Sequence, residues 1–345
     1  MHGFTLKGVA NLLMSAVVTT PRLSKLLKMY TDLATADPDT ISKNVRVFRG
    51  FIQDVGDVRC HEVTRLMVTQ HLASLRKSGK ADATVRGYGL SISGVFSFGI
   101  DNINGFTVNP CRGVKLPRID KHLPRFWTED EVKRFHEAID YVFRNDPVRR
   151  AQWHGLLYVL CDSGLRIGEG ENLRWKDFIL RLDPEDKQTS VVMIRKRDDQ
   201  PGQWAWKPKG RRDRVFPLSE NCVSVLTWLQ LECPWAYPFL PKERYEYLRA
   251  NVDRISRRTK KRPRGSAIYK EWARIKSRAG VKGSGAFHRM RSTAARRYAP
   301  HLSERALRAG FGWQDASTAD IYTGELDVDV EAIAKIQSIT AGEGT

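Results

Sequence analysis

Residues 109–124 read NPCRGVKLPRIDKHLP, and this stretch divides the chain into two parts. It holds three prolines, one glycine and several basic residues. Because proline fixes φ and lacks an N–H donor, such a composition favours an extended segment over a helix or a strand. We therefore expect a linker over residues 113–125, with one domain on each side of it.

The part before the linker has the spacing of amphipathic helices. Apolar residues recur every three or four positions through residues 63–75 and 85–98, and no alternating strand pattern competes with them. These segments predict a helical domain over residues 22–112, preceded by an N-terminal extension of residues 1–21.

A turn around Gly79 separates those two helical segments and is flanked by basic side chains. They are Lys77, Lys80 and Arg86. A small helical bundle could present them to the phosphate backbone of a nucleic acid. A solvated basic turn explains them equally well, so this stretch alone leaves both interpretations open.

The part after the linker begins with a helix signal. Thr128 and Glu131 form a capping-box pattern ahead of an amphipathic apolar run. Farther on, residues 191–195 and 214–218 are short and β-rich, and a polar, glycine-containing connection joins them as a long hairpin. The expected fold is mainly α with a small antiparallel β-hairpin or sheet, which lies in a second domain over residues 126–327.

The chain is strongly basic for its length of 345 residues. Its 58 Lys and Arg residues outnumber 39 Asp and Glu residues, which gives a formal net charge of +19 and a pI near 9.9. Such a field favours a polyanion, so double-stranded DNA is the partner we expect; a generally basic soluble surface is the alternative. The densest basic run is RISRRTKKRPR, residues 254–264, and four of its side chains are candidate DNA contacts: Arg257, Arg258, Lys260 and Lys261.

Cysteine usage, hydropathy and motif content argue against several classes of protein. The five cysteines lie too far apart for a zinc knuckle or a redox pair, which predicts reduced thiols. No Walker-type loop and no His and carboxylate cluster with metal-ligand spacing occurs, so we expect no cofactor and no metal. The apolar stretch of residues 12–18 is too short to cross a bilayer, so the expected location is the cytoplasm, at the nucleoid, without membrane contact.

Several segments of the second domain carry groups suited to binding or attacking a phosphodiester. Arg166 lies in CDSGLRIGEGENLRW, and Lys209 lies in KPKGRRDRVFPL. His288 and Arg291 lie in AFHRMR, and Tyr322 lies in FGWQDASTADIYTG. Since His288 and Arg291 are three residues apart, a helix would place both on one face.

In their order and separations these segments resemble the catalytic domain of the tyrosine recombinases, the phage integrase family, over residues 155–324. Each motif is weak by itself, because Gly-Leu-Arg or His-x-x-Arg arises often by chance, but the ordered set is specific. The resemblance implies a catalytic set of six side chains: Arg166, Lys209, His288, Arg291, Trp313 and Tyr322. It also implies that Glu169, three residues after Arg166, supports the neighbouring basic groups.

Two of these assignments have competitors. Lys207 lies two residues before Lys209 and is the alternative general acid, whereas Tyr298 is a poor rival of Tyr322. The hairpin also carries other basic side chains, each of which could contact the backbone of DNA: Arg211, Arg212 and Arg214.

Three features depart from the pattern of the family. Trp313 stands where most members have a second histidine, and its indole N–H donates a hydrogen bond but cannot transfer a proton. Residues 170–172 replace a usually apolar stretch, which puts the packing after Arg166 in question. Ser292 stands where many members have a histidine or another polar group.

The implied reaction is a phosphoryl transfer. Two arginine forks bind the non-bridging oxygens with directional, charge-assisted hydrogen bonds. The phenol of Tyr322, with an ordinary pKa of about 10, needs a nearby base or a cationic site, and His288 is the expected helper. A lysine whose pKa is lowered by cationic neighbours protonates the leaving 5′ oxygen, which is the role assigned to Lys209.

The resemblance implies a site-specific DNA recombinase that cleaves and rejoins strands through a 3′-phosphotyrosyl intermediate. It implies a SAM-like core DNA-binding bundle that clamps the duplex together with the catalytic domain, and a homotetramer that assembles from monomers in the synaptic complex. The amphipathic residues 328–345 suit docking on a neighbouring protomer or packing on their own domain. A type IB topoisomerase-like relaxase and a non-catalytic DNA-binding relative are the alternatives.

Overall fold

The computed structural model describes most of the chain. The described residues are 20–119, 125–181, 189–197, 206, 208, 213–251, 266–283 and 287–313. The chain divides into two compact units, Met1–Lys121 and His122–Thr345. The expected linker spans this division, and the domain limits drawn from the sequence stay predictions.

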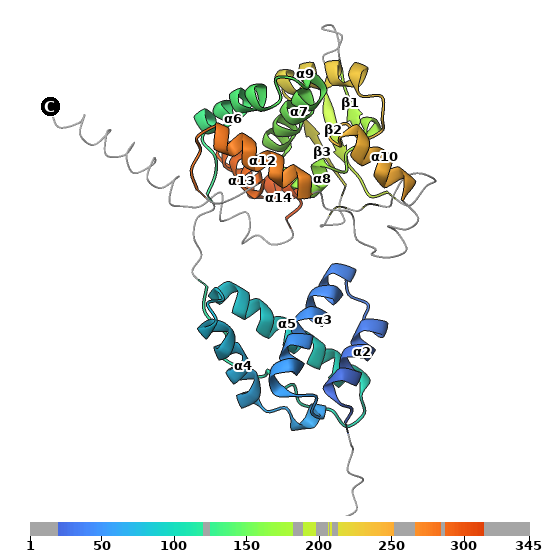
Figure 1. The fold of residues 1–345 in the computed structure, drawn as a ribbon, viewed down its shortest axis with the longest axis vertical. Helices are drawn as coiled ribbons and strands as arrows, with labels where there is room; N and C mark the ends of the chain where they lie inside the picture. The colour runs from blue at the N-terminus through green and yellow to red at the C-terminus, as the bar shows by residue number, and fades with distance from the viewer. Residues whose placement is uncertain are drawn as a thin grey trace, which may run out of the picture. The chain divides into compact units, whose positions relative to one another are not determined.

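The described part of the first unit is a bundle of α-helices (Figure 1). Its elements are α2 (Leu23–Leu33), α3 (Pro38–Val55), η1 (Cys60–Glu62), α4 (Arg65–Lys77) and α5 (Asp82–Asn102). α3 begins where the Asp37 carboxylate accepts the N–H of Asp39 and Pro38 takes the first helical position, both of which favour a helix start. α4 begins where Thr64 Oγ1 accepts the N–H of Met67.

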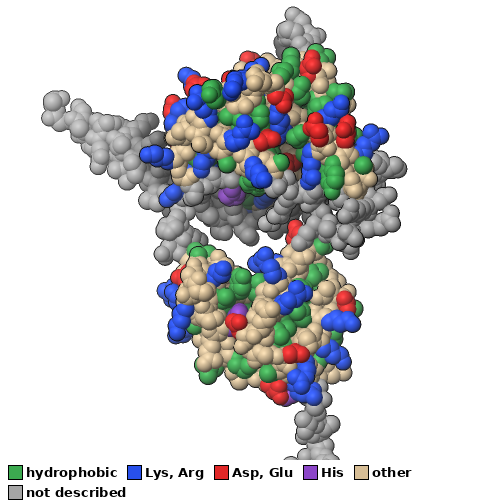
Figure 2. Space-filling view, in the orientation of Figure 1, with side chains coloured by type: hydrophobic (Ala, Val, Ile, Leu, Met, Phe, Trp, Pro, Cys, Tyr) green, Lys and Arg blue, Asp and Glu red, His purple; other side chains and the backbone are tan. Residues whose placement is uncertain are grey.

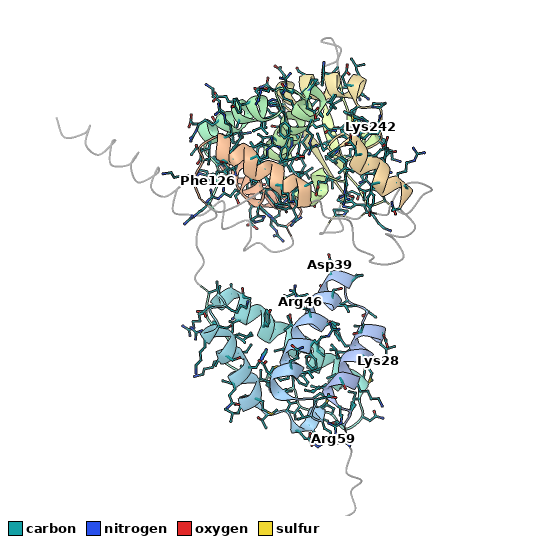
Figure 3. The ribbon with its side chains drawn as sticks, viewed as in Figure 1. Lys28, Asp39, Arg46, Arg59, Phe126 and Lys242 are labelled. Atoms are coloured by element: carbon teal, nitrogen blue, oxygen red, sulfur yellow. The ribbon has the colours of Figure 1, made fainter. Side chains whose placement is uncertain are left out.

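Aromatic side chains fill the core of this bundle. Phe48 and Phe51 of α3 lie against Phe96 of α5, with ring centroids 5.2 and 6.1 Å apart, and all three are fully buried. α3 runs the length of the unit, from Asp39 in its first turn to an end near Arg59 (Figure 3). The helical domain expected from the apolar spacing is therefore confirmed.

The second unit is mainly helical and contains a small sheet (Figure 1). Its elements in chain order are α6 (Glu129–Val142), α7 (Pro147–Ser163), α8 (Ile167–Gly170), η2 (Trp175–Asp177), β1 (Phe178–Ile179), β2 (Val191–Ile194), β3 (Arg214–Pro217), α9 (Glu220–Glu232), α10 (Lys242–Ala250), α12 (Ser266–Arg278), α13 (His288–Tyr298) and α14 (Glu304–Phe311). The expected capping box at the start of α6 is present: Thr128 Oγ1 accepts the N–H of Glu131 at 3.1 Å, and the Glu131 carboxylate accepts the N–H of Thr128 at 2.9 Å.

α7 is the central helix of this unit. It packs against α6, α9, α13 and β3, and its Trp153 lies in the core with Phe135 of α6 and Trp272 of α12. Because packing fixes this helix on several sides, the backbone that follows its last turn has a defined position. That segment can therefore position functional side chains. The segment before α6 is bound to α13, because the Thr293 hydroxyl of α13 accepts the N–H of Trp127 at 2.8 Å.

The sheet is antiparallel, with strand order β1-β2-β3. β2 and β3 pair from Val191 opposite Pro217 to Ile194 opposite Arg214, which confirms the hairpin expected from the sequence. The strand β1 was missed because it is two residues long and follows directly on the turn η2. A further backbone pair, Arg197 with Trp206, lies beyond the end of β2.

None of the helices in the described ranges is long and apolar enough to cross a membrane. All five cysteines are free thiols, and four of them are buried. Burial raises the pKa of Cys60 to about 11 and the pKa of Cys161 to about 12, so these two thiols stay protonated at neutral pH.

Candidate active site

Arg166 lies in the short turn between α7 and α8. α7 ends at Ser163, and Gly164 follows in the left-handed conformation with φ 59° and ψ 27°. The next side chain, Leu165, is fully buried, whereas the side chain of Arg166 is 32% exposed. The turn therefore anchors one residue in the core and leaves the guanidinium that follows it accessible.

Gly164 is required by its backbone conformation and also by its packing. A Cβ on this residue would clash with Cε1 of Phe311, the last residue of α14. The Phe311 ring is itself 1% exposed and stacks on the Trp313 ring at 4.8 Å between centroids. The Gly-Leu-Arg motif thus brings the end of α7 and the end of α14 into direct contact.

We expect Gly164→Ala to lower the free energy of unfolding by about 2–5 kcal/mol, because the left-handed φ and the clash with Phe311 both cost energy. The matched control is Gly168→Ala in α8, where a Cβ would meet no atom within 4 Å and no positive φ occurs. Urea unfolding monitored by circular dichroism gives both values. Equal values for the two variants would contradict an energetic cost from either the left-handed φ or the clash with Phe311.

Glu169 lies beneath Arg166 and is 3% exposed. Its Oε2 accepts the backbone N–H of Arg166 at 3.0 Å, and its Oε1 accepts Nη1 of Arg166 at 3.3 Å and Nη2 of Arg214 at 2.8 Å. Burial opposes ionisation, but Arg214, the N–H of Arg166 and the Arg166 guanidinium together outweigh it and hold the pKa of Glu169 below its ordinary value. An ionised carboxylate therefore joins the two guanidinium groups.

Arg214 corrects one prediction made from the sequence. It was counted among the hairpin arginines that could contact the backbone of DNA, but it is only 7% exposed and pairs with Glu169. Along β3, burial alternates, so Arg214 and Phe216 point into the unit while Val215 is exposed. The sequence carries no such signal, because exposed Val215 and buried Phe216 are both apolar.

Arg291 lies at the floor of the site and is 1% exposed. Its Nη1 donates to the carbonyl oxygen of Gly164 at 2.8 Å, and its Nη2 donates to the carbonyl oxygen of Phe311. The same Phe311 carbonyl accepts Nη1 of Arg214 at 3.0 Å. Hydrogen bonds therefore connect Arg166, Glu169, Arg214 and Arg291, and we call these four residues the arginine network.

His288 and Trp313 flank Arg291. His288 is the first residue of α13, one helical turn before Arg291, and it is exposed. Trp313 is 6% exposed, and the Arg291 guanidinium lies 5.6 Å from the centroid of its ring. The packing role of Trp313 is thus visible, while its role as a donor to a phosphate stays a prediction.

Several expected site residues lie outside the described residues. They are Tyr322, Lys207, Lys209, Arg211, Arg212, Arg257, Arg258, Lys260 and Lys261. The rival tyrosine is described: the Tyr298 hydroxyl donates to the carbonyl oxygen of Asp162 at 2.7 Å, and burial raises its pKa. Both features make Tyr298 a weak nucleophile.

The basic residues expected to contact DNA in the first unit differ in exposure. Lys77 and Lys80 are exposed, whereas Arg86 is partly buried and its Nη1 donates to the carbonyl oxygen of Pro117 at 3.3 Å. Figure 2 shows Lys and Arg side chains spread over the visible faces of both units rather than collected in one patch. Within the described ranges, no three His, Cys, Asp or Glu side chains are grouped so as to hold a metal ion.

Residues 125–327 match the model of the phage integrase family. The chain belongs to this family. It is a tyrosine recombinase, an enzyme that cleaves and rejoins DNA strands at specific sites through a tyrosine nucleophile. The match spans α6 to α14, which includes every member of the arginine network.

Full-length relatives and solved structures agree with this family. The recombinase is 26% identical over 314 residues to the tyrosine recombinase XerA of Thermococcus kodakarensis, covering 89% of this chain and 91% of the relative. It is 24% identical over 330 residues to a tyrosine recombinase of Thermosipho africanus, covering 91% and 100%. Both alignments therefore cover nearly the whole chain.

The fold is similar to that of recombinases solved with DNA. A lambda integrase dimer bound to a COC′ core site has a TM-score of 0.63 at 16% identity, covering 94% of this chain and 83% of that chain. XerH bound to a palindromic difH substrate, in a post-cleavage complex, has a TM-score of 0.63 at 18% identity, covering 92% and 95%. A lambda integrase tetramer bound to a Holliday junction has a TM-score of 0.62 at 16% identity, covering 94% and 84%.

Proposed function

We propose that this recombinase exchanges DNA strands by forming a 3′-phosphotyrosyl bond to Tyr322, assisted by Arg166, Arg291, His288 and Lys209. The observation that carries the proposal is the arginine network. It joins Arg166 and Arg291, which are far apart in the sequence, through hydrogen bonds to Glu169 and to the Phe311 carbonyl. Two segments that bring their arginines into one connected cationic site are better suited to binding a single phosphate than to contacting separate phosphates at the surface.

The chemistry of a phosphodiester explains why such a site is needed. Its non-bridging oxygens are negative and repel a nucleophile, and their charge persists in the transition state. Preorganised guanidinium groups stabilise that charge, since their fork of N–H donors matches two oxygens at once. The arginine network connects Arg166 to Arg291, so we assign both to the non-bridging oxygens.

The proposed step conserves atoms and charge. The Tyr322 phenolic oxygen forms a bond to phosphorus, the bond from phosphorus to the 5′ oxygen breaks, and His288 accepts the phenolic proton. Lys209 gives a proton to the departing 5′ oxygen, with Lys207 as its competitor. Because the phosphotyrosyl bond replaces one phosphate ester with another, a second 5′ hydroxyl can reverse the step without ATP.

Glu169 and Trp313 act around these groups. The Glu169 carboxylate neutralises part of the charge of Arg166 and Arg214, and so allows guanidinium groups to lie close together inside the unit. Trp313 packs on Phe311 and so supports the carbonyl that Arg214 and Arg291 share. We also assign its indole N–H to a phosphate oxygen.

The partner is double-stranded DNA, and the active assembly is a homotetramer formed on two recombination sites from protomers that are monomers in free solution. The solved lambda integrase tetramer on a Holliday junction supports this stoichiometry. Residues 22–112 act as a core DNA-binding domain and residues 126–327 as the catalytic domain, with residues 328–345 docking on a neighbouring protomer. The exposed Lys77 and Lys80 contact the backbone of the duplex, as do Arg211 and Arg212 of the hairpin and the basic residues of 254–264. The protein acts at the nucleoid.

A type IB topoisomerase-like relaxase would use similar side chains but reseal the same strand. The named relatives over most of the chain are tyrosine recombinases, which does not favour that alternative. A non-catalytic relative would be expected to lose members of the catalytic set, whereas all six of its residues are present in this sequence.

Covalent capture tests the proposal and does not require a known DNA site. Purified protein is incubated in EDTA with a pool of nicked duplexes of randomised sequence, and DNA that resists extraction after denaturation is amplified and sequenced. We expect the wild-type chain to select one site and to form a covalent adduct on it. Tyr322→Phe should lower adduct yield by at least about a thousandfold, because the nucleophile is absent.

Tyr298→Phe is the matched control for that variant. It removes one phenolic hydroxyl from the same unit and leaves Tyr322 intact, so it should form the adduct at the wild-type yield after correction for any unfolded fraction. Adduct formation by Tyr322→Phe, or its loss in Tyr298→Phe alone, would contradict the assignment. Tight DNA binding without any wild-type adduct would support the non-catalytic alternative.

A further inference from the structure

We infer that Arg197 and Trp206 form a clamp that positions the catalytic lysine of the β2–β3 connection. The inference rests on the proposed function, in which Lys209 or its competitor Lys207 protonates the leaving oxygen. Arg197 and Trp206 both belong to the described residues, and the two lysines follow Trp206 closely in the sequence. The clamp residues are positioning residues, because they act through the lysine.

The backbone of the clamp is a complete antiparallel pair. The N–H of Arg197 donates to the carbonyl oxygen of Trp206 at 2.7 Å, and the N–H of Trp206 donates to the carbonyl oxygen of Arg197 at 2.9 Å. This reciprocal pair lies beyond the end of the regular β2–β3 ladder, which closes at Ile194 and Arg214. The two sides of the connection are therefore fixed to each other at two separate points.

The two sides of the connection contain different numbers of residues between these two points. On one side residues 195–196 lie between them, and on the other side residues 207–213 do. The longer side contains both lysines, and it is tied at Trp206 and again at Arg214. In the sequence, Lys207 follows Trp206 directly and Lys209 lies three residues after it.

The side chains of the clamp make the pair rigid. The Arg197 guanidinium lies 5.0 Å from the centroid of the Trp206 ring, which is 3% exposed, and Nη1 of Arg197 donates to Oδ2 of Asp177 at 2.7 Å. The side chains of Arg197 and Asp177 are 9% and 4% exposed. A buried ion pair under a buried indole loses much of its stabilisation when either partner is removed, so this pair resists opening.

The clamp is also joined to the segment that carries Arg166. Nη2 of Arg197 donates to the carbonyl oxygen of Asn172. Asn172 in turn donates its N–H to the Glu169 carbonyl at 3.1 Å and its side-chain amide to the Gly168 carbonyl at 2.8 Å. The backbone carbonyl of Asn172 therefore connects the clamp to the end of α8, and the Asn172 side chain holds that end through its hydrogen bond to Gly168.

This connection has a consequence for catalysis. A general acid must come within hydrogen-bond reach of the oxygen that it protonates, and the lysine side chain is long and flexible. A backbone fixed at Trp206 and registered to the Arg166 segment restricts where the lysine ammonium can go. Loosening the clamp should therefore slow proton transfer to the leaving oxygen while leaving DNA affinity unchanged.

A substrate with sulfur in place of the 5′-bridging oxygen tests this role. A thiol has an ordinary pKa of about 8.5, so a leaving thiolate needs no general acid at neutral pH. The probe is the duplex that wild-type protein selects by covalent capture, made with either oxygen or sulfur at the scissile bond. Trp206→Leu and Arg197→Lys should slow single-turnover cleavage of the oxygen substrate by at least about thirtyfold, and cleavage of the sulfur substrate by less than about threefold.

Two sets of controls distinguish a failure of the clamp from a failure of the proposed function. Trp272→Leu removes another buried tryptophan of the same unit, and it should affect the two substrates equally. Lys209→Ala and Lys207→Ala should show which lysine gives the selective loss. No wild-type adduct would overturn the proposed function. The clamp alone would be overturned by a different set of results. In that set, the wild-type protein forms the adduct and sulfur rescues a lysine variant. Trp206→Leu and Arg197→Lys, however, lose equal activity on both substrates or lose none.

Discussion

Arg291→Ala is expected to slow formation of the DNA adduct by about a thousandfold or more, and Arg291→Lys by at least about a hundredfold. The guanidinium donates at the same time to the Gly164 and Phe311 carbonyls. Lysine keeps the charge but has no planar fork, so it cannot hold both carbonyls and also stabilise a phosphate. Single-turnover cleavage at saturating protein measures the effect, because it separates the chemical step from DNA binding.

Arg149→Lys is the matched control for the loss of a buried arginine fork. Arg149 is 8% exposed, lies in the first turn of α7 and donates to Glu271 of α12, far along the helix from the site. It should lower stability and leave the rate of cleavage unchanged at a temperature where the protein is folded. An Arg291→Lys variant that cleaves DNA as fast as Arg149→Lys would contradict the role given to Arg291.

Glu169→Ala is expected to lower the free energy of unfolding by about 3–5 kcal/mol, since it leaves the buried charge of Arg214 without its carboxylate. The side chains of both partners are 4% exposed, and the contact between them is 2.8 Å. The variant should also lose cleavage activity, because Arg166 hydrogen bonds to the same carboxylate. Urea unfolding and the capture assay measure the two losses.

Glu131→Ala is the control for the capping part of this effect. Glu131 also accepts the N–H of the residue three positions before it, but it is partly exposed. Its removal should cost about 1 kcal/mol, as for an ordinary helix cap. A loss for Glu169→Ala no larger than this would show that the contact with Arg214 contributes little.

The pH dependence of stability gives a second test of Glu169. Burial opposes ionisation, but Arg214 and Arg166 outweigh it, so the folded-state pKa lies below the ordinary value of 4.5. The stabilising contribution of the carboxylate is complete above that ordinary pKa and is lost as the pH falls through the lowered folded-state pKa. Wild type and Glu169→Gln should therefore differ in stability at neutral pH and converge in acid.

Local signals were enough to predict most of the secondary structure. The capping box at Thr128 and Glu131 and the apolar spacing around it depend on residues close in sequence, and both predicted α6 correctly. The hairpin partners were also recognisable, because alternation and β-branched residues mark β2 and β3. The strand β1 was missed since two residues give no periodicity to detect.

The arginine network could be predicted only in part. Arg166, Glu169 and Arg291 came from the resemblance to a family, while Arg214 was assigned to the wrong environment. Its partners are Glu169 and the Phe311 carbonyl, which are distant in the sequence, so no local pattern indicates them. The basic neighbours Arg211 and Arg212 suggested a surface that could contact DNA.

The structure gives a physical reason for two of the departures from the family pattern, Gly170 and Asn172. A Cβ at Gly170 would lie 2.9 Å from Cδ1 of Leu156, so a small residue lets the turn after Arg166 pack against α7. The side-chain amide of Asn172 donates to the carbonyl oxygen of Gly168 at 2.8 Å and so holds the end of α8. Ser292 is buried on α13, and nothing in the structure explains why it replaces a larger polar residue.

The identity of the nucleophile is the central claim, and mass spectrometry of the trapped adduct tests it most directly. The wild-type adduct is digested with nuclease and trypsin, and the peptide that retains a nucleotide is sequenced by fragmentation. We predict a 3′-phosphotyrosyl bond on Tyr322. A nucleotide attached to Tyr298, to another tyrosine or to a residue that is not tyrosine would contradict this assignment.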